Sequence, residues 1–177
     1  GGPYLMDVMG CSPVTAGNLL FLLTLGVVIG NPASGFLSDR IVKKRKGIVV
    51  IALAGYSLTL AAMAFVPVGA PLWVLACLFS LFGLFAGTGS LPYAHLKELT
   101  PPERSATALT VLNFSAILGA GVFMQGLGLL IETLHPRSAL SIEGFRDAFL
   151  ACAACMGAAA LLYASTRESR MGTRESE

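Results

Sequence analysis

Long stretches without a charged residue alternate along this chain with short polar segments. Five runs contain no Asp, Glu, Lys, Arg or His: Thr15–Leu37, Ile48–Val66, Leu72–Leu91, Ala106–Ile131 and Ala148–Ala164. Each run is close to or above the roughly 17 to 25 residues that cross a bilayer as a helix. Strands of a transmembrane barrel would be about 10 residues long with alternating polarity, which these runs lack. The pattern therefore predicts an all-α integral membrane protein.

We expect five complete transmembrane helices after a short N-terminal stub, forming a single transmembrane domain over residues 1–177. The predicted spans are residues 13–37, 47–66, 71–94, 103–131 and 146–165, and residues 166–177 form a polar tail. Ser12 has the position of an N-cap before Pro13, a favourable first helical residue. Thr100 and Glu103 have the spacing of a capping box that would open the fourth span. The chain begins without Met, which we interpret as the start of a fragment.

The composition agrees with a membrane protein and argues against one class of partner. Hydrophobic residues make up 55% of the chain and charged residues 12%, whereas soluble domains are about 25% charged. The net charge of +2 is small, and the bases are not interleaved with aromatic residues as in a single-strand binding surface. We therefore expect the lipid bilayer as the surrounding medium and no nucleic-acid partner.

The distribution of the bases predicts an orientation. Ten of the 12 Lys and Arg residues fall in the loops after the first and third spans or in the C-terminal tail. Only Arg137 and Arg146 lie on the other side. Because Lys and Arg are enriched in cytoplasmic loops, the base-rich loops and the C-terminus are predicted to be cytoplasmic, in a plasma or inner membrane.

The sequence offers little enzyme chemistry. It contains no Ser/His/Asp arrangement, no pair of carboxylates within the spans and no cluster with metal-ligand spacing, so we expect no catalytic residue, metal or cofactor. Cys152 and Cys155 form a C-x-x-C pattern inside an Ala-rich span, where small residues that pack a helix face are the simpler interpretation. His95 and His135 lie at predicted loop margins, where we expect solvated or interfacial side chains.

Neutral polar side chains inside the spans are the candidate cavity and substrate residues: Thr24, Asn31, Asn113 and Gln125. Thr24 and Asn31 are seven residues apart and share a helix face, whereas Asn113 and Gln125 are about 120° apart and cannot both face one cavity centre. For any one of them, a hydrogen bond to a neighbouring helix is the alternative.

Small residues also recur at helix-packing spacing, which predicts close contacts between helices. They are Gly26, Gly30 and Ser34 in the first span, Gly83 and Gly87 in the third, and Ala116 and Ala120 in the fourth.

The segment Gly35–Lys44, GFLSDRIVKK, resembles the G-x-L-[SA]-D-R-x-G-[RK]-[RK] loop of the major facilitator superfamily, which joins the second and third helices of each six-helix half. It departs from that pattern at Val42, where the family has glycine. The segment Thr100–Ala106 is similar to the entry of the fifth helix of a half, and Gln125-Gly126 is typical of that helix.

The resemblance implies half of a 12-helix transporter, a secondary active permease that moves a small solute by alternating access. The missing N-terminal six-helix half of the same polypeptide would be its partner. We favour the C-terminal half, helices seven to twelve with the first only a stub, because the third span lacks the arginine-containing motif of a fourth helix and the chain stops after its last span. The first, third and fourth spans would line the cavity, and the second and fifth would face lipid.

The resemblance also implies a conformational gate. Its members would be Gly35, Ser38, Asp39, Arg40, Lys43 and Lys44, together with Arg104. Asp39 would contact a helix N-terminus or Arg104 in one of two conformations. The alternatives to a transporter are a structural or scaffold membrane protein and, with less support from the residues, a membrane-embedded enzyme.

Overall fold

The computed structural model describes residues 2–42, 45–135 and 141–166, with the side chains of residues 39, 41 and 42 left out. The elements are η1 (Tyr4–Val8), α1 (Pro13–Phe36), η2 (Leu37–Val42), α2 (Arg45–Ala64), α3 (Leu72–Ala86), η3 (Gly87–Ser90), α4 (Leu91–Leu99), α5 (Pro102–Leu134) and α6 (Ile142–Ala164). Within the described ranges there is no strand, and five helical units are long and apolar enough to cross a membrane. The all-α membrane fold with five spans is therefore confirmed.

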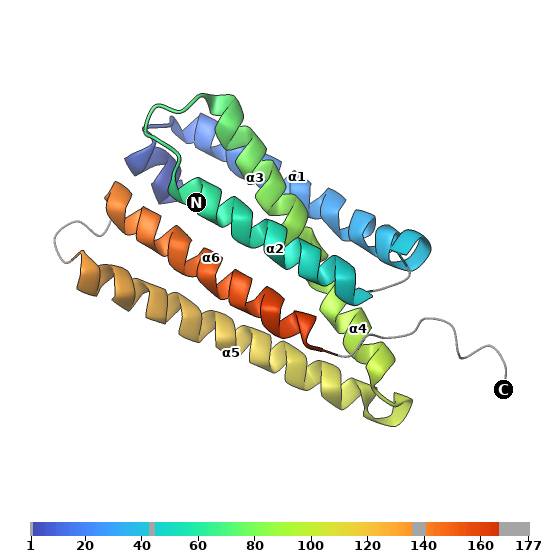
Figure 1. Cartoon of the computed structure of the whole chain (residues 1–177). Helices are drawn as coiled ribbons and strands as arrows, with labels where there is room; N and C mark the ends of the chain where they lie inside the picture. Colours follow the sequence, from blue (N-terminus) through green and yellow to red (C-terminus); the bar gives the residue numbers. More distant parts are fainter. Residues whose placement is uncertain (1, 43–44, 136–140, 167–177) are drawn as a thin grey trace.

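The helices form an elongated bundle with α2 near its middle (Figure 1). One side of α2 packs on α6 and another on α3, and α1 packs along α3. The longest helix, α5, lies beside α6 at the edge of the bundle (Figure 1) and contacts α4 and α6. A bundle built in this way leaves α1 and α5 at its margins.

The contact between α1 and α3 depends on glycine. Gly26 in α1 and Gly87 in η3 are buried. A Cβ atom on Gly26 would lie 2.6 Å from the carbonyl oxygen of Ser80, and one on Gly87 would lie 2.7 Å from that of Val27. Since these neighbours are backbone atoms, they cannot move aside without shifting a helix. The predicted small-residue contacts of the first and third spans are thus confirmed.

The third predicted stripe of small residues makes no helix contact within the described part of the chain. Ala116 and Ala120 are exposed, and none of the 33 residues of α5 is buried. A helix of this length spans about 50 Å, well beyond a hydrocarbon core of about 30 Å. The face of α5 that carries Ala116 and Ala120 therefore packs on no helix that the structure describes.

The third span is interrupted. The α-helix α3 ends at Ala86, a single 3-10 turn covers Gly87–Ser90, and α4 then continues to Leu99. Gly87 and Gly89 lower the helix stability of this stretch, since each is about 1 kcal/mol less favourable than Ala in a helix. Pro92 removes a backbone hydrogen-bond donor just after it. The α-helical hydrogen bonding is therefore interrupted here, and the helical path runs five residues past the predicted end at residue 94.

The helix starts were only partly predictable. The Ser12 hydroxyl accepts a hydrogen bond from the backbone N–H of Thr15 at 3.2 Å, which confirms the cap of α1. The predicted capping box at the start of α5 is wrong. Its N-cap is Pro101, and the Thr100 hydroxyl instead donates to the carbonyl oxygen of Leu96 at 2.7 Å, which ties it to the preceding helix.

Replacing Gly26 by Ala should destabilise the bundle, although the same change usually stabilises a helix by about 0.5–1 kcal/mol. The added methyl group would overlap the α3 backbone, and overpacking of this kind costs about 1–3 kcal/mol. Thermal unfolding of the complete polypeptide in detergent measures the effect. Gly17→Ala in the same helix is the matched control, because a Cβ there meets nothing within 4 Å. Equal unfolding temperatures for both variants would refute the role given to Gly26.

Candidate functional site

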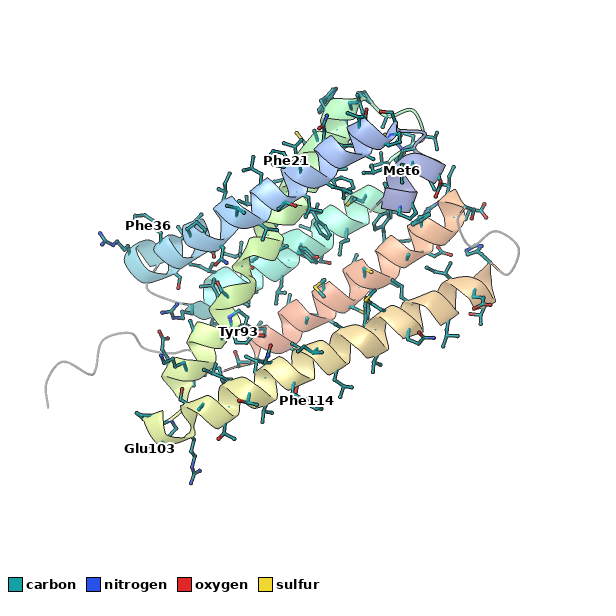
Figure 2. The ribbon with its side chains drawn as sticks, turned by 180° about the vertical axis from the view of Figure 1, so that it is seen from behind. Met6, Phe21, Phe36, Tyr93, Glu103 and Phe114 are labelled. Atoms are coloured by element: carbon teal, nitrogen blue, oxygen red, sulfur yellow. The ribbon has the colours of Figure 1, made fainter. Side chains whose placement is uncertain are left out.

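A row of polar side chains crosses the first, third and fourth spans. The Ser90 hydroxyl donates to Asn31 Oδ1 at 2.8 Å, and the Tyr93 hydroxyl donates to Asn113 Oδ1 at 3.3 Å. Ser90 and Tyr93 are three residues apart, about one helical turn, so the two pairs lie next to each other. Tyr93 lies on α4, on the side from which it reaches Asn113 of α5 (Figure 2). We call Asn31, Ser90, Tyr93 and Asn113 the polar row.

The polar row lies on the surface of this chain although it belongs to membrane spans. Asn31 and Asn113 are both exposed. Burying an amide in hydrocarbon without full hydrogen bonding costs several kcal/mol, and polar side chains in membrane helices face a protein interior or a water-filled cavity. The polar row therefore identifies the side of the bundle that must face either water or another protein surface, because hydrocarbon cannot satisfy its hydrogen-bonding groups.

The other two candidate residues lie apart from the row. The Thr24 hydroxyl donates to the carbonyl oxygen of Leu20 in its own helix at 3.0 Å. Gln125 is exposed and makes no side-chain hydrogen bond among the described residues. It lies in a shallow hollow of about 670 Å³ along α5, lined otherwise by Ile117, Leu118, Gly121, Val122, Gly126 and Leu129. Of the four candidates, the structure brings only Asn31 and Asn113 into one row.

The residues of the predicted gate lie at the end of α1 and just beyond it. Gly35 is in the last turn of α1, and residues 37–42 continue as a π-helical turn. Ser38 is fully buried, and its hydroxyl has no hydrogen-bond partner within the described part of the chain. Arg40 is exposed, with its guanidinium carbon 5.9 Å from the centre of the Phe36 ring.

The remaining gate residues are less fully placed. Arg104 is exposed in the first turn of α5. The backbone of Asp39 belongs to the π-helical turn, but its side chain lies outside the described residues, as do Lys43 and Lys44 entirely.

Sequence reasoning missed a polar cluster that joins α2, α4 and α6. Glu98 Oε1 lies 2.6 Å from Arg45 Nε, and His95 Nδ1 lies 2.6 Å from the Tyr163 hydroxyl. His95 is only 3% exposed, so the prediction of a solvated or interfacial histidine is wrong. The reason is the longer path of α4, which carries His95 into the bundle. His95 and Glu98 share one helix face at i, i+3 spacing, and that spacing was the available signal.

The opposite end of the bundle has its own polar contact. His135 Nε2, at the C-terminal end of α5, lies 2.9 Å from Asp147 Oδ2 in α6. The Ser141 hydroxyl caps α6 by accepting from the Gly144 N–H at 3.2 Å. The His135–Asp147 contact therefore holds the C-terminal end of α5 to α6, whose start the Ser141 cap stabilises.

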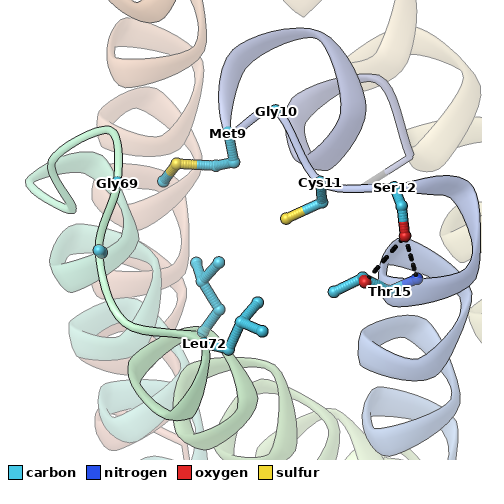
Figure 3. A pocket seen from close by; sticks show the side chains of 9 residues that line it. Met9, Gly10, Cys11, Ser12, Thr15, Gly69 and Leu72 are labelled. Carbon is cyan, nitrogen blue, oxygen red and sulfur yellow. Dashed lines mark hydrogen bonds between the residues drawn. The ribbon is translucent and has the colours of Figure 1, made fainter.

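A cavity of about 260 Å³ lies at the same end, between the Met9–Thr15 segment and the turn that precedes α3 (Figure 3). The Ser12 hydroxyl at its wall lies 2.9 Å from the Thr15 hydroxyl and also accepts from the Thr15 N–H. Because these polar groups already serve as the cap of α1, the cavity offers fewer free hydrogen-bonding groups than the polar row does.

Metal-ligating groups do not gather in the described part of the chain. No set of three His, Cys, Asp or Glu side chains there is close enough to hold a metal ion, and Cys152 and Cys155 are both free.

The chain belongs to the Major Facilitator Superfamily, whose family model matches residues 2–177. The chain is 28% identical over 125 residues to the riboflavin transporter RibZ of Clostridioides difficile (strain 630), a match that covers 68% of this chain and 27% of that protein. It is 24% identical over 136 residues to the membrane sensor protein UhpC of Escherichia coli (strain K12), covering 76% of this chain and 31% of UhpC. The chain thus spans less than a third of the length of either relative.

Replacing Tyr163 by Phe should destabilise the protein, because it leaves His95 Nδ1 buried without its partner. An unsatisfied buried polar group costs about 1–3 kcal/mol. Thermal unfolding of the complete polypeptide checks the effect. The control is Tyr56→Phe, since the Tyr56 hydroxyl makes no hydrogen bond among the described residues and its ring packs on Phe82 in the same way without it.

The double variant His95→Leu/Tyr163→Phe separates the hydrogen bond from the packing. Removing both partners eliminates the unsatisfied group, so this variant should recover most of the stability that Tyr163→Phe loses. An additive loss would contradict the assigned hydrogen bond.

Proposed function

We propose that this chain is the larger part of one six-helix half of a secondary active transporter, which moves a small solute across the cytoplasmic membrane by alternating access. The observation that carries this proposal is the polar row, exposed hydrogen-bonding groups within membrane spans that face away from the rest of the chain. The row draws on the first, third and fourth spans, which the family resemblance assigns to the cavity. Membership of the family and the match to a transporter support the same function.

The proposed partner is the other six-helix half of the same polypeptide. No residue of α5 is buried within the described part of the chain, and both Asn113 and Gln125 are exposed on it. Another half packed across α1 and α5 would enclose the polar row and leave a site between the halves, near the bilayer midplane. Because the third span lacks the arginine-containing motif of a fourth helix, this chain would belong to the C-terminal half, with its base-rich loops in the cytoplasm.

The chemistry of the row suits a solute that forms hydrogen bonds. Its members are two amides and two hydroxyls, and neither carboxylates nor bases are among them. Binding sites for small molecules combine apolar walls with a few polar groups of this kind. The row would therefore fix the orientation of a polar, uncharged part of the solute.

The match to UhpC favours one alternative, a membrane sensor. In that case the polar row would bind a ligand and the resulting conformational change would be read by another protein without solute flux. Binding of a solute by the complete polypeptide in liposomes, with no uptake of that solute, would support the sensor over the transporter.

Replacing either Asn31 or Asn113 by Leu should weaken solute binding. A lost neutral hydrogen bond costs about 0.5–1.5 kcal/mol, so we expect KM to rise about 2- to 12-fold for each variant. Uptake by liposomes that contain the complete polypeptide provides the measurement. Asn18→Leu is the matched control, because Asn18 is exposed in α1 but lies about 140° around the helix from Asn31. Reduced stability with unchanged KM in the Asn31 and Asn113 variants would instead favour a scaffold role.

We further propose that Asp39 stabilises one of the two conformations of the transporter. It lies between the buried Ser38 and the exposed Arg40 at the base-rich end of α1. A carboxylate near a helix N-terminus gains about 0.3–2 kcal/mol, which is enough to bias an equilibrium without fixing it. Its partner would be a helix start in the other half, or the start of α5 with Arg104.

Asp39→Asn should accordingly change the ratio of inward-open to outward-open molecules by about 2- to 30-fold, the range that this dipole energy gives. Distances between spin labels on the two faces of the complete polypeptide report that ratio. Asp7→Asn, an exposed carboxylate at the opposite end of the bundle, should leave it unchanged. The gate assignment fails if Asp39→Asn alters neither the ratio nor the uptake rate.

A further inference from the structure

We propose that the solute of the polar row presents hydrogen-bond acceptors, carbonyl oxygens or ring nitrogens, to the side-chain amide nitrogens of Asn31 and Asn113. Ser90 and Tyr93 are the positioning residues that hold the two amides in this orientation. This inference deepens the proposed function and rests on it, because it takes the polar row as a solute site. The observation behind it is the direction of the two hydrogen bonds within the row.

Both hydrogen bonds of the polar row run in the same direction. The Ser90 hydroxyl donates to Asn31 Oδ1 at 2.8 Å, and the Tyr93 hydroxyl donates to Asn113 Oδ1 at 3.3 Å. A hydroxyl group has one proton, so both protons are already used and both amide oxygens already have a partner. Neither amide nitrogen has a hydrogen-bond partner among the described residues. The unmatched groups of the row are therefore the N–H donors of Asn31 and Asn113.

An unmatched donor is costlier than an unmatched lone pair once the row is enclosed. Buried backbone N–H groups without a partner are rarer in proteins than carbonyl oxygens with one lone pair left empty, and the same reasoning applies to a side-chain amide. Asn31 and Asn113 are exposed on this chain, but a second half packed over them removes the water that serves their N–H groups. A solute with acceptors satisfies these donors, whereas a solute with donors alone leaves them without partners.

Neighbouring hydroxyl groups on the same helices add no free donor. Thr110, one turn before Asn113, donates to the carbonyl oxygen of Ala106 at 3.0 Å, and Thr24, two turns before Asn31, donates to that of Leu20 at 3.0 Å. Their protons stay within their own helices. The two amides consequently determine which polarity of solute the row prefers.

The hydroxyls of Ser90 and Tyr93 determine which end of each amide faces the solute. The terminal torsion of an Asn side chain is broad and roughly two-fold, so an amide by itself can present either its oxygen or its nitrogen. A hydroxyl that donates to the oxygen fixes that end toward α4 or the turn before it and leaves the nitrogen facing away. Ser90 and Tyr93 thus act on the solute through Asn31 and Asn113.

Two small neutral probes test this polarity. N,N′-dimethyluracil has carbonyl acceptors and no N–H group, whereas meta-diaminobenzene, a ring of similar size, has N–H donors and no carbonyl group. Titration calorimetry at neutral pH measures the binding of each probe to the complete polypeptide in detergent. Each hydrogen bond contributes about 2- to 12-fold, so dimethyluracil should bind about 4- to 150-fold more tightly than diaminobenzene. Equal affinities, or tighter binding of diaminobenzene, would overturn the inference.

Asn31→Asp and Asn113→Asp exchange the exposed donor for an acceptor with little change of shape. The carboxylate keeps one oxygen for the hydroxyl of Ser90 or Tyr93 and replaces the amide nitrogen by a second oxygen. Each variant should lower the affinity for dimethyluracil about 2- to 12-fold and raise the affinity for diaminobenzene. Asn18→Asp, at an exposed position of α1 outside the row, is the matched control and should change neither affinity.

Ser90→Ala and Tyr93→Phe test the positioning role. Without its hydroxyl partner an amide can turn, so the ratio of the two probe affinities should fall about 2- to 12-fold in each variant. Ser90→Thr keeps the hydroxyl at an exposed position and should retain the ratio of the unmodified protein. A purely structural role would lower the unfolding temperature and leave the ratio unchanged. That result, or a ratio that survives both Asp variants, contradicts the inference.

Binding and flux distinguish this inference from the proposed function, because calorimetry needs no solute flux. The expected preference for dimethyluracil, together with an absence of solute flux in liposomes, contradicts the transporter alone. Solute flux together with equal affinities for the two probes contradicts the acceptor assignment alone.

Discussion

The contact between the backbones of α1 and α3 is the interaction on which the rest of the structure depends. Lipid tails are as apolar as the side chains, so helices in a bilayer are held together largely by close packing and hydrogen bonds. Gly26 and Gly87 permit an approach at which a single methyl group would overlap the neighbouring backbone. That approach places the turn Gly87–Ser90 directly beside Asn31, within reach of the Ser90 hydroxyl. The same glycines therefore shape the bundle and position one end of the polar row.

Polar groups lie on different sides of α4, which follows the turn Gly87–Ser90. Tyr93 reaches Asn113 of α5, whereas His95, two residues later and about 200° around the helix, reaches Tyr163 of α6. Opposite sides of α4 thus contribute to the exposed row and to the buried contact with α6.

The sequence predicted those features that the bilayer itself dictates. Charge-free runs gave the five spans, and glycine spacing gave the α1–α3 contact, because both follow from local composition. The extension of α4, the burial of His95 and the loss of the Thr100 cap all depend on contacts that form only after folding. The candidate site was predictable to the same extent. Asn31 and Asn113 were identified as polar residues in spans, but their hydrogen bonds to Ser90 and Tyr93 are visible only in the folded structure. Thr24 is likewise a neutral polar residue inside a span, but its hydroxyl forms a hydrogen bond only with the backbone of its own helix.

The attachment of α5 explains why so long a helix can lack a buried residue. It is held to α4 through Asn113 and to the start of α6 through His135, while the Gln125 face between these two points packs on nothing described. A helix fixed at a few points along its length keeps its orientation but leaves a continuous surface for another partner. In a transporter whose halves rock against each other, such a surface can exchange contacts with the opposite half without repacking the bundle behind it. The weak packing of α5 within this chain is consistent with that role, because a helix buried among its own neighbours would have to break those contacts at each cycle.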